Sequence, residues 1–503
     1  MNTESVRDRR RFAGLLAATF CLLTLPRLLT HELWRDEAWL WLVVRGGGSP
    51  IDLLKPLARS GQGYLFPVLC YLAGRVWSSP LAMQMVHLLL AGAGAYVFAR
   101  WAPFGQIERA LFVLGYFPFY EYAVISRHYA AGVLLLWLAC AAARSRRPAL
   151  GVGAALGLLC QTTVYGYILA IAVAVGWLLD RRLHRNEAPP IPRGEAAAGL
   201  VLGLAGAAAG LVQMIPASGT GFAPGWHVGW EPVRALRVFQ MPWRAFVPWP
   251  RLELHFWNSN LLDSWPAIQA VAGGLLLVLV AVVLRRHLAA LAMFCSGAAG
   301  LLLFSYLKLI GPVRYHGHLW LLLFAALWLR DGLPADARRR SWPARALLAL
   351  LIVHVGAAGV ASWVDLRHPF SNAGEAARLI RAAGMEDQPL LGHRDPPSAT
   401  VALALGRPLY SPSRRIFTWY PDWGPVQRNL SNTELRCASR ELARQEGRDI
   451  GLVLNAAAPP WPEIEMVGST SGAIEPTEDY FIYRLRYARL QETAAMAQCK
   501  AEP

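Results

Sequence analysis

Residues 12–41 read FAGLLAATFCLLTLPRLLT followed by HELWRDEAWLW, and the rest of the chain is organised around this junction. The first part is an apolar run long enough to cross a membrane. The second part, residues 31–41, places two adjacent carboxylates, Asp36 and Glu37, beside Arg35 and among three tryptophans. Tryptophan is common where a helix leaves the bilayer because its ring is apolar and its N–H is polar. The acid pair has no such explanation, and it is either a candidate general base or metal ligand, or a solvated turn that caps a helix.

The composition of the 503-residue chain is that of an integral membrane protein. Hydrophobic residues make up 55% and charged residues only 16%, which is too apolar for an ordinary soluble protein. The length allows a membrane bundle plus one further domain. The formal net charge is +16, but the arginines come in short clusters between apolar runs. We therefore assign the positive charge to cytoplasmic loops and not to nucleic-acid binding.

The N-terminus resembles a signal peptide, with a basic head at residues 7–11 and an apolar run at residues 12–25. No small-residue cleavage site follows before Asp36, so we expect this segment to remain as the first membrane span. Five of the seven cysteines lie in apolar stretches, and no pair has the spacing of metal ligands. Only Cys437 and Cys499 could then form a disulfide.

A spanning helix needs about 20 apolar residues, and fewer where it is buried among other helices. We therefore predict an all-α polytopic membrane bundle with about eleven transmembrane helices, near residues 12–30, 82–99, 107–122, 129–143, 149–163, 165–180, 196–215, 266–284, 288–308, 318–330 and 344–363. Basic clusters mark cytoplasmic loops, and they lie at residues 7–11, 100–109, 144–147, 181–185, 285–287 and 338–345. The N-terminus is then cytoplasmic, and the outward segments are residues 31–80, 121–128, 216–265, 311–317 and the tail.

Three regions outside the spans have their own patterns. Residues 64–78 are predicted to form an interfacial helix. The loop 216–265 is rich in Trp and Pro without apolar periodicity, which suggests interfacial segments that line a wet cleft. From about residue 364 the composition is soluble, with helices predicted at 374–384 and 434–447 and strands at 389–391, 450–455 and 480–486. The sequence therefore predicts a transmembrane domain over residues 1–363 and a small periplasmic α/β domain over residues 364–503.

Three groups of polar residues stand at helix ends on the expected outer side. They are Arg35, Asp36 and Glu37, then Glu121, Arg127, His128 and Tyr129, and finally Arg314, His316 and His318. Ionisable residues at membrane depth are usually functional, and arginines together with carboxylates suit a phosphate-bearing donor and a proton transfer. The alternatives are an interfacial ion pair for Glu121 and Arg127, and helix-capping surface histidines for His316 and His318. The i,i+2 spacing of these histidines does not favour a two-His metal site.

An Asp-Glu pair after the first span, an acid and arginine patch after the third, an arginine at a late helix end and an outward C-terminal domain resemble the GT-C superfamily of polyprenyl-phosphate-sugar glycosyltransferases, near the protein mannosyltransferase and lipid A aminoarabinose transferase branches. The motifs DEAW (residues 36–39), EYAVISR (121–127) and RYHG (314–317) also resemble a less characterised bacterial GT-C-like group. The resemblance covers about residues 10–330 as architecture. It implies that Asp36 matches the catalytic acid of the first outer loop and that Glu121 is a candidate for the acidic role of the second. Where members often have a His-Pro pair at the start of the interfacial helix, this chain has GQGY at residues 61–64.

The resemblance implies a hexosyl- or pentosyltransferase of the bacterial inner membrane. Such an enzyme moves a sugar from a polyprenyl-phosphate-linked donor to a glycan, lipid or protein acceptor on the periplasmic side, with inversion at the anomeric carbon. The expected catalytic residues are Asp36, Glu37 and Glu121, and the expected substrate-binding residues are Arg35, Arg127, His128, Tyr129, Arg314, His316 and His318. The need for a divalent cation is left open, and no nucleic acid is expected.

Two other classes also fit an apolar chain with charges at its helix ends. A membrane transporter or a lipid flippase of the cell envelope would place such charges in its bundle. The repeated halves and broken midplane helices that are typical of transporters are not evident in the sequence. A nonenzymatic partner in an envelope assembly complex is the third alternative.

Overall fold

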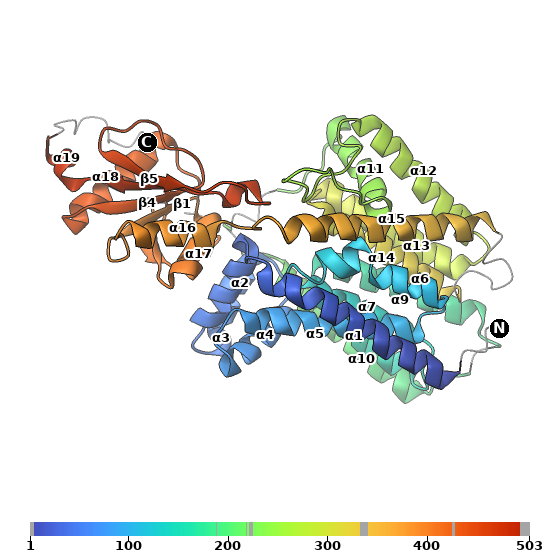
Figure 1. The fold of residues 1–503 in the computed structure, drawn as a ribbon. Helices are drawn as coiled ribbons and strands as arrows, with labels where there is room; N and C mark the ends of the chain where they lie inside the picture. The colour runs from blue at the N-terminus through green and yellow to red at the C-terminus, as the bar shows by residue number, and fades with distance from the viewer. Residues whose placement is uncertain are drawn as a thin grey trace. The chain divides into compact units, whose positions relative to one another are not determined.

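The computed structural model describes residues 5–187, 189–217, 219–220, 225–331, 341–424 and 428–492 (Figure 1). It is mostly helical, with one small sheet near the C-terminus. Contacts within the chain divide it into two compact units. The first, the bundle unit, comprises Met1–Leu29, Gly61–Pro216 and Pro224–Trp363, and the second, the sheet unit, comprises Thr30–Ser60, Ala217–Ala223 and Val364–Pro503.

Long apolar helices form most of the bundle unit. Among the described residues, seven helices have the length and composition to cross a membrane: α1 (Val6–Thr30), α5 (Leu81–Trp101), α9 (Val164–Leu183), α10 (Arg193–Met214), α12 (Pro266–Leu284), α13 (Leu288–Leu307) and α15 (Trp342–Asp365). On α10, the side chains of Leu200, Val201, Leu204 and Val212 are each at least 62% exposed. An apolar face of this kind is unfavourable in water and stable against lipid, so the chain is a membrane protein.

The predicted count of about eleven spans is not confirmed. Three predicted spans correspond to the shorter helices α7 (Tyr129–Ala142), α8 (Pro148–Leu159) and α14 (Val313–Leu329), which have 14, 12 and 17 residues. A helix of 12 residues is only about 18 Å long, less than the hydrocarbon core of a bilayer. The stretch predicted as an interfacial helix forms α4 (Leu65–Val76), and its position relative to a bilayer remains a prediction.

The stretch predicted as a span over residues 107–122 is not one continuous helix. The chain forms the short helix α6 (Gln106–Val113) and then a π-helix, η1 (Tyr116–Glu121). Pro118 lies inside η1 and cannot donate a backbone hydrogen bond, so a regular α-helix is disfavoured there. Gly115, directly before η1, packs so closely that a Cβ on it would lie 3.1 Å from the Cβ of His354 on α15. Single π-helical turns are frequent at functional sites.

Close glycine contacts join α8 to α10. A Cβ on Gly199 would lie 2.2 Å from the carbonyl oxygen of Ala149, and a Cβ on Gly153 would lie 2.0 Å from that of Gly199. Gly206 and Gly157 meet in the same way farther along the two helices. In lipid, small residues allow the close backbone approach that holds helices together. The short helix α8 is therefore anchored in the bundle by its partner.

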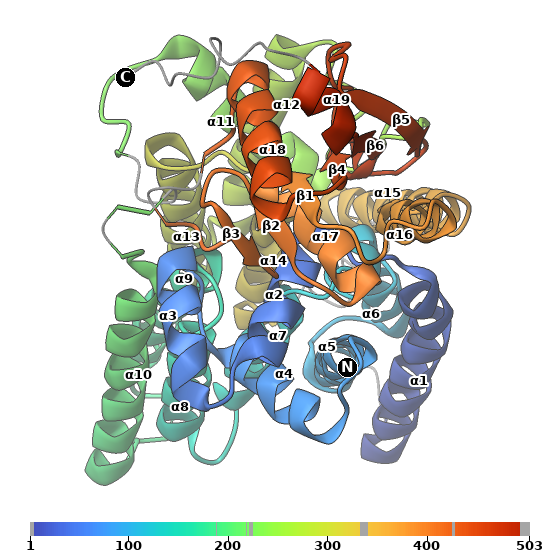
Figure 2. The same ribbon diagram turned by 90° about the vertical axis from the view of Figure 1, so that its left-hand side faces the viewer.

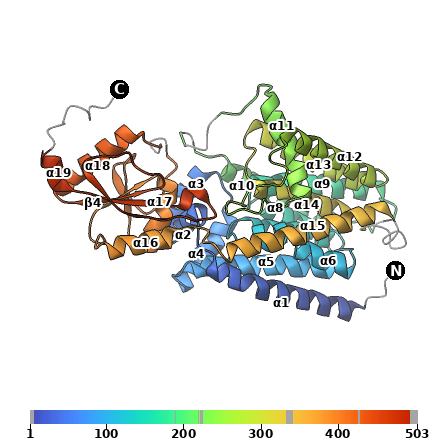
Figure 3. The same ribbon diagram turned by 45° about the horizontal axis from the view of Figure 1, so that its top comes forward.

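The region of residues 216–265 contains a helix that the sequence analysis did not predict. This helix, α11 (Pro232–Phe246), packs against α12 and α14, and Figure 3 shows it beside α12. Its buried residues recur at helical spacing, at Ala235, Val238, Met241 and Ala245. The interpretation that residues 216–265 have no apolar periodicity is therefore wrong for this stretch, whereas its interfacial position stays a prediction. The surrounding tryptophans and prolines obscured a short amphipathic repeat.

The sheet unit contains a six-stranded sheet with the strand order β3-β2-β1-β4-β6-β5 (Figure 1). The strands are β1 (Leu390–His393), β2 (Leu409–Ser411), β3 (Ile416–Thr418), β4 (Ile450–Leu454), β5 (Ile464–Ser469) and β6 (Phe481–Leu485). β1 is parallel to β2 and β4, and the other neighbours pair antiparallel. Helix α18 (Asn432–Glu446) contributes to one apolar core of the unit, whereas α16 (Ala373–Ala382) and α17 (Asp395–Leu405) contribute to the other.

The predicted α/β character of the tail is confirmed. Both predicted helices and all three predicted strands are present, as α16, α18, β1, β4 and β6. The sequence analysis missed α17, β2, β3 and β5, and two of these strands are only three residues long. Cys437 on α18 is disulfide-bonded, and Cys499, the other cysteine considered for a bridge, lies outside the described residues.

Two helices from the N-terminal part of the chain belong to the sheet unit. Helix α2 (Arg35–Gly46) packs against α17, as Figure 2 shows, and α3 (Pro50–Ser60) follows it in sequence. The Nε1–H of Trp39 donates to the carbonyl oxygen of Pro421 at 3.0 Å, across 382 positions of sequence. The helix that begins with the predicted acid pair is therefore built into the same compact unit as the tail.

Candidate active site

Glu121, the last residue of η1, is buried in the bundle unit, and its carboxylate is held by an indole and a phenol. The Nε1–H of Trp257 donates to both carboxylate oxygens at 3.2 Å, and the Tyr116 hydroxyl lies 3.5 Å from Oε2. Glu121 is only 1% exposed. Burial of a carboxylate is unfavourable unless donors of this kind replace water. The bundle unit therefore fixes one of the predicted acids in a defined orientation.

Arg314, in the first turn of α14, contacts the same indole. Its guanidinium carbon lies 5.1 Å from the centroid of the Trp257 ring and 5.4 Å from that of Tyr315, within the range of cation–π attraction. Its backbone carbonyl accepts the Tyr122 hydroxyl at 2.6 Å. The structure thus brings Glu121 and Arg314 together on Trp257, the acid at the N–H edge and the guanidinium at the ring face. The sequence analysis named both charged residues but gave Trp257 no role.

Stacked aromatic rings surround the start of α14. The Tyr165 ring stacks on Tyr315 at 4.6 Å and on His318 at 5.0 Å, measured between ring centroids. The Tyr129 ring lies 5.3 Å from Tyr122 and 5.9 Å from His318. The Nδ1 of His318 lies 2.9 Å from the Tyr315 carbonyl oxygen, to which it must donate, so Nε2 is left as an acceptor. These rings form an apolar wall with polar edges beside Arg314.

The remaining predicted residues of the bundle unit have other neighbours. The Nη2 of Arg127 donates to Oε1 of Gln62 at 3.2 Å. His128 directly precedes α7 and is 2% exposed, and its ring lies 5.7 Å from that of Phe66 in α4. His316 is likewise 2% exposed. Arg127 and His128 therefore pack with the turn that precedes α4, which is the position where the GT-C resemblance has its His-Pro pair.

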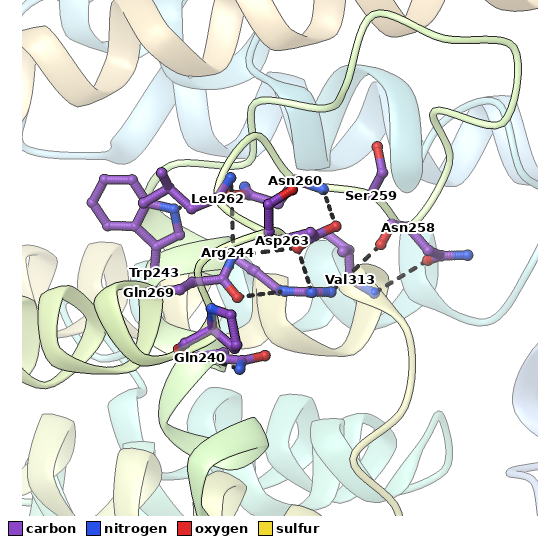
Figure 4. Close-up of polar contacts among 12 residues, drawn as sticks. Gln240, Trp243, Arg244, Asn258, Ser259, Asn260, Leu262, Asp263, Gln269 and Val313 are labelled. Carbon is purple, nitrogen blue, oxygen red and sulfur yellow. Dashed lines mark hydrogen bonds and ion pairs between the residues drawn. The ribbon is translucent and has the colours of Figure 1, made fainter.

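A hydrogen-bonded network includes Asn258 and Val313, the chain neighbours of Trp257 and Arg314 (Figure 4). Asn258 directly follows Trp257 and has a φ of 66°, a value that asparagine tolerates better than most residues. Its Oδ1 accepts the backbone N–H of Val313, directly before Arg314, at 3.2 Å. The segment that carries the indole and the helix that carries the guanidinium are thus tied together next to the two side chains.

Arg244 of α11 is the centre of this network. Its Nη2 pairs with Oδ1 of Asp263 at 2.6 Å, its Nε donates to Oε1 of Gln269 at 3.3 Å, and its Nη1 lies 3.5 Å from the Asn258 carbonyl. Oδ1 of Asn260 accepts the N–H groups of Trp243 and Gln269, both at 3.1 Å. The sequence analysis missed this network. The signal for it was the short polar stretch Asn258-Ser259-Asn260, with Asp263 three residues later.

In the sheet unit, the acid pair opens α2, and its two members differ in burial. Asp36 is half-buried, whereas Glu37 is fully buried. Oε2 of Glu37 lies 3.1 Å from Nε2 of His31 and 3.4 Å from the backbone N of Trp34. Nδ1 of His31 lies 3.4 Å from Oδ1 of Asp365. Burial lowers the pKa of His31, but the charges of Glu37 and Asp365 outweigh it and raise the pKa to about 10, so the ring is an imidazolium at neutral pH.

Glu478 holds the start of α2 from the tail. Its Oε1 accepts the backbone N–H of Arg35 at 2.9 Å, and its Oε2 accepts the hydroxyls of Tyr480, Ser371 and Thr400 at 2.7, 2.9 and 3.0 Å. Burial raises the pKa of Glu478 to about 7, although these four bonds favour the ionised form. A carboxylate at a helix N-terminus satisfies an otherwise unpaired amide. The turn with Asp36 is therefore fixed by a residue that the sequence analysis did not single out.

Neither metal ligands nor relatives add to this description. Among the described residues, no group of three or more His, Cys, Asp or Glu side chains is arranged to hold a metal ion. Comparison of the sequence with models of protein families and with curated proteins gives no match.

Proposed function

We propose that the protein is a membrane glycosyltransferase of GT-C type that moves a sugar from a polyprenyl phosphate carrier to an acceptor. The observation that carries the proposal is the arrangement around Trp257, where Arg314 lies over the ring face and Glu121 is bound at the N–H edge. A guanidinium beside a wall of tyrosines suits a donor that combines a phosphate with a sugar ring, because the cation binds phosphate and the rings cover the sugar.

The proposed reaction is a single displacement at the anomeric carbon. Asp36 takes the proton from the acceptor hydroxyl, the acceptor oxygen forms the new bond to the anomeric carbon, and the bond from that carbon to the phosphate oxygen breaks. Polyprenyl phosphate leaves with the electron pair of the broken bond, and the configuration at the carbon is inverted. Arg314 stabilises the negative charge that develops on the departing phosphate. Glu37, bound to His31 and Trp34, is assigned a structural role at the start of α2.

We further propose that the protein resides in the bacterial inner membrane, with the N-terminus in the cytoplasm and residues 364–503 in the periplasm. The support for this orientation is the position of the six basic clusters in the sequence. A reporter that is active only in the periplasm, fused after residue 503, is expected to be active. If only a cytoplasmic reporter at this position were active, the orientation would be the opposite of the proposed one.

The test of the proposed reaction is transfer of labelled sugar from polyprenyl phosphate in membranes that contain the full-length protein. Asp36→Asn keeps the shape of the side chain but cannot accept the proton, so turnover should fall roughly 10²- to 10⁴-fold while donor binding stays nearly unchanged. Glu37→Gln, at equal expression, is the matched control and should retain more activity. Full activity of Asp36→Asn would show that Asp36 is not the general base. If Glu37→Gln were inactive while Asp36→Asn stayed active, Glu37 would be the base instead.

A further inference from the structure

A polar cavity of about 400 Å³ lies in the bundle unit, at the helix ends opposite to the site around Arg314. Arg314 and Tyr165 stand in the first turns of α14 and α9, whereas the cavity is lined from the last turns of α7, α9 and α14 and the start of α13. Since α9 has 20 residues, the two places are about 30 Å apart, roughly the thickness of a bilayer core. The cavity is therefore a second place in the unit where charged side chains gather.

One side of the cavity is built from Asp180 and two histidines. Oδ1 of Asp180 lies 3.2 Å from Nδ1 of His184 and 3.9 Å from Nε2 of His287. Nδ1 of His287 accepts the backbone N–H of Ala290 at 3.3 Å, so its ring proton is on Nε2 and faces Asp180. Nδ1 of His184 lies 3.1 Å from the Asp180 carbonyl oxygen, which requires its proton there and leaves Nε2 as an acceptor. Together with Glu187, this side of the cavity offers acceptors.

The rest of the lining offers donors. Arg144 forms an ion pair with Asp331 and donates to the carbonyl oxygen of Trp328 at 3.2 Å, while Arg181 donates to that of Pro189 at 2.6 Å. The Nε1–H of Trp177 is buried and has no hydrogen-bond partner among the described residues. A buried N–H without an acceptor is unfavourable, so this donor indicates that a ligand or water completes the site.

We propose that this cavity binds the zwitterionic headgroup of a phosphatidylethanolamine-type lipid. A primary ammonium needs several acceptors, which Asp180, Glu187 and Nε2 of His184 supply. A phosphate needs cations and N–H donors, which Arg181 and Trp177 supply. Among the described residues that line the cavity, three are carboxylates and two are arginines, so a zwitterion matches this lining better than a simple anion does.

The surroundings of the cavity favour a lipid over a soluble phosphoethanolamine as the ligand. Ala143, Trp177 and Leu329 add apolar surface to the lining of the cavity. A lipid can place apolar atoms against this surface, whereas a soluble phosphoethanolamine has few to place there. The site also lies at the ends of membrane-spanning helices, where lipid headgroups are found.

The test counts the lipids retained by the full-length protein in native mass spectrometry. Phosphatidylethanolamine, phosphatidylcholine and phosphatidylglycerol with the same acyl chains are offered separately in detergent. Because a quaternary ammonium cannot donate to the carboxylates, we expect about tenfold stronger retention of phosphatidylethanolamine than of phosphatidylcholine. Asp180→Asn should abolish this preference, and Trp177→Phe, which keeps the ring, should weaken both lipids by about tenfold. Trp101→Phe, at an exposed tryptophan at the end of α5, should change neither.

Several outcomes would overturn the proposal. Equal retention of all three lipids by the unaltered protein would show that the cavity does not distinguish between lipid headgroups. Preference for phosphatidylglycerol would show that the site selects anions. A preference that survives in Asp180→Asn, or lipid retention that is unchanged in Trp177→Phe, would place the lipid elsewhere. Displacement by soluble phosphoethanolamine as effective as by the lipid would contradict the choice of a lipid. If the Asp180→Asn protein did not fold, the amount of lipid retained by Trp177→Phe would test the proposal.

Discussion

The two units hold their buried carboxylates in different ways. In the bundle unit, Glu121 and Arg314 contact different parts of one indole, so an aromatic ring stands at the centre of the charged group. In the sheet unit, Glu37 pairs directly with His31, and Glu478 accepts four hydrogen bonds. The contacts of Glu478 hold the start of α2, whereas the bundle unit places the Arg314 guanidinium beside the rings of Trp257 and Tyr315. Under the proposed function, the bundle unit would supply donor recognition and the sheet unit would fix the helix with Asp36.

The largest effect in this comparison is expected at Arg314. Arg314→Ala should weaken binding of polyprenyl phosphate by about 1.5–3 kcal/mol, the size of a hydrogen bond to a charged group, as measured by titration of the full-length protein. Arg234→Ala is the matched control, since Arg234 also lies over a tyrosine ring, that of Tyr306, at 5.9 Å. Unchanged affinity in a folded Arg314→Ala protein would restrict Arg314 to anchoring α14.

A smaller effect is expected from the residue that fixes α2. Glu478→Ala removes the acceptor of the Arg35 amide and should lower kcat roughly 10- to 100-fold with little change in donor KM. The reason is that even a small displacement of Asp36, the proposed base, slows the reaction strongly. Glu478→Gln, which keeps an oxygen for that amide, should recover most of the activity.

The control for Glu478 is a second buried carboxylate of the sheet unit. Glu463 accepts hydrogen bonds from Arg436 at 2.7 and 2.9 Å and from Arg440 at 2.7 Å. Glu463→Ala should lower thermal stability as Glu478→Ala does but leave kcat per folded molecule intact. Equal losses of kcat in the two alanine variants would mean that Glu478 acts only through the stability of the unit.

The smallest expected effect is on the pH dependence of stability. The pKa of Glu478 rises from 4.5 to about 7 and that of His31 from 6.5 to about 10 on folding, so the folded sheet unit holds protons that the unfolded chain has released. Each group therefore contributes stability that is present below its unfolded pKa and is lost as pH rises through its folded pKa. The melting temperature should fall in two windows, near pH 4.5–7 and 6.5–10. Glu478→Gln should flatten the first window and His31→Gln the second, as followed by circular dichroism of the sheet-unit transition.

Local patterns in the sequence were enough to predict the elements with a regular repeat. The apolar runs predicted most long helices, and five helices and strands of the tail followed from short periodic segments. The break at Gly115 and Pro118 was not predicted, because the apolar composition of residues 107–122 outweighed these two residues in a hydropathy reading. Helix α11 was missed for a related reason, since its amphipathic repeat lies among prolines and tryptophans.

The partners of the site residues could not be predicted, because they come from distant parts of the chain. Arg35 and Glu478 are 443 positions apart, and Glu121 and Trp257 are 136 apart. Nothing in either local sequence encodes these pairs, and only the folded topology brings them together. The residue types at the helix ends were visible in the sequence, whereas the contacts that orient them were not.

The central claim is that Arg314 binds the phosphate of a polyprenyl carrier, and an experimental structure with bound polyprenyl phosphate tests it most directly. The account predicts phosphate density within hydrogen-bond distance of the Arg314 guanidinium, about 2.7–3.2 Å, and next to the tyrosines at the start of α14. Phosphate density away from Arg314, in a sample that transfers sugar, would contradict it.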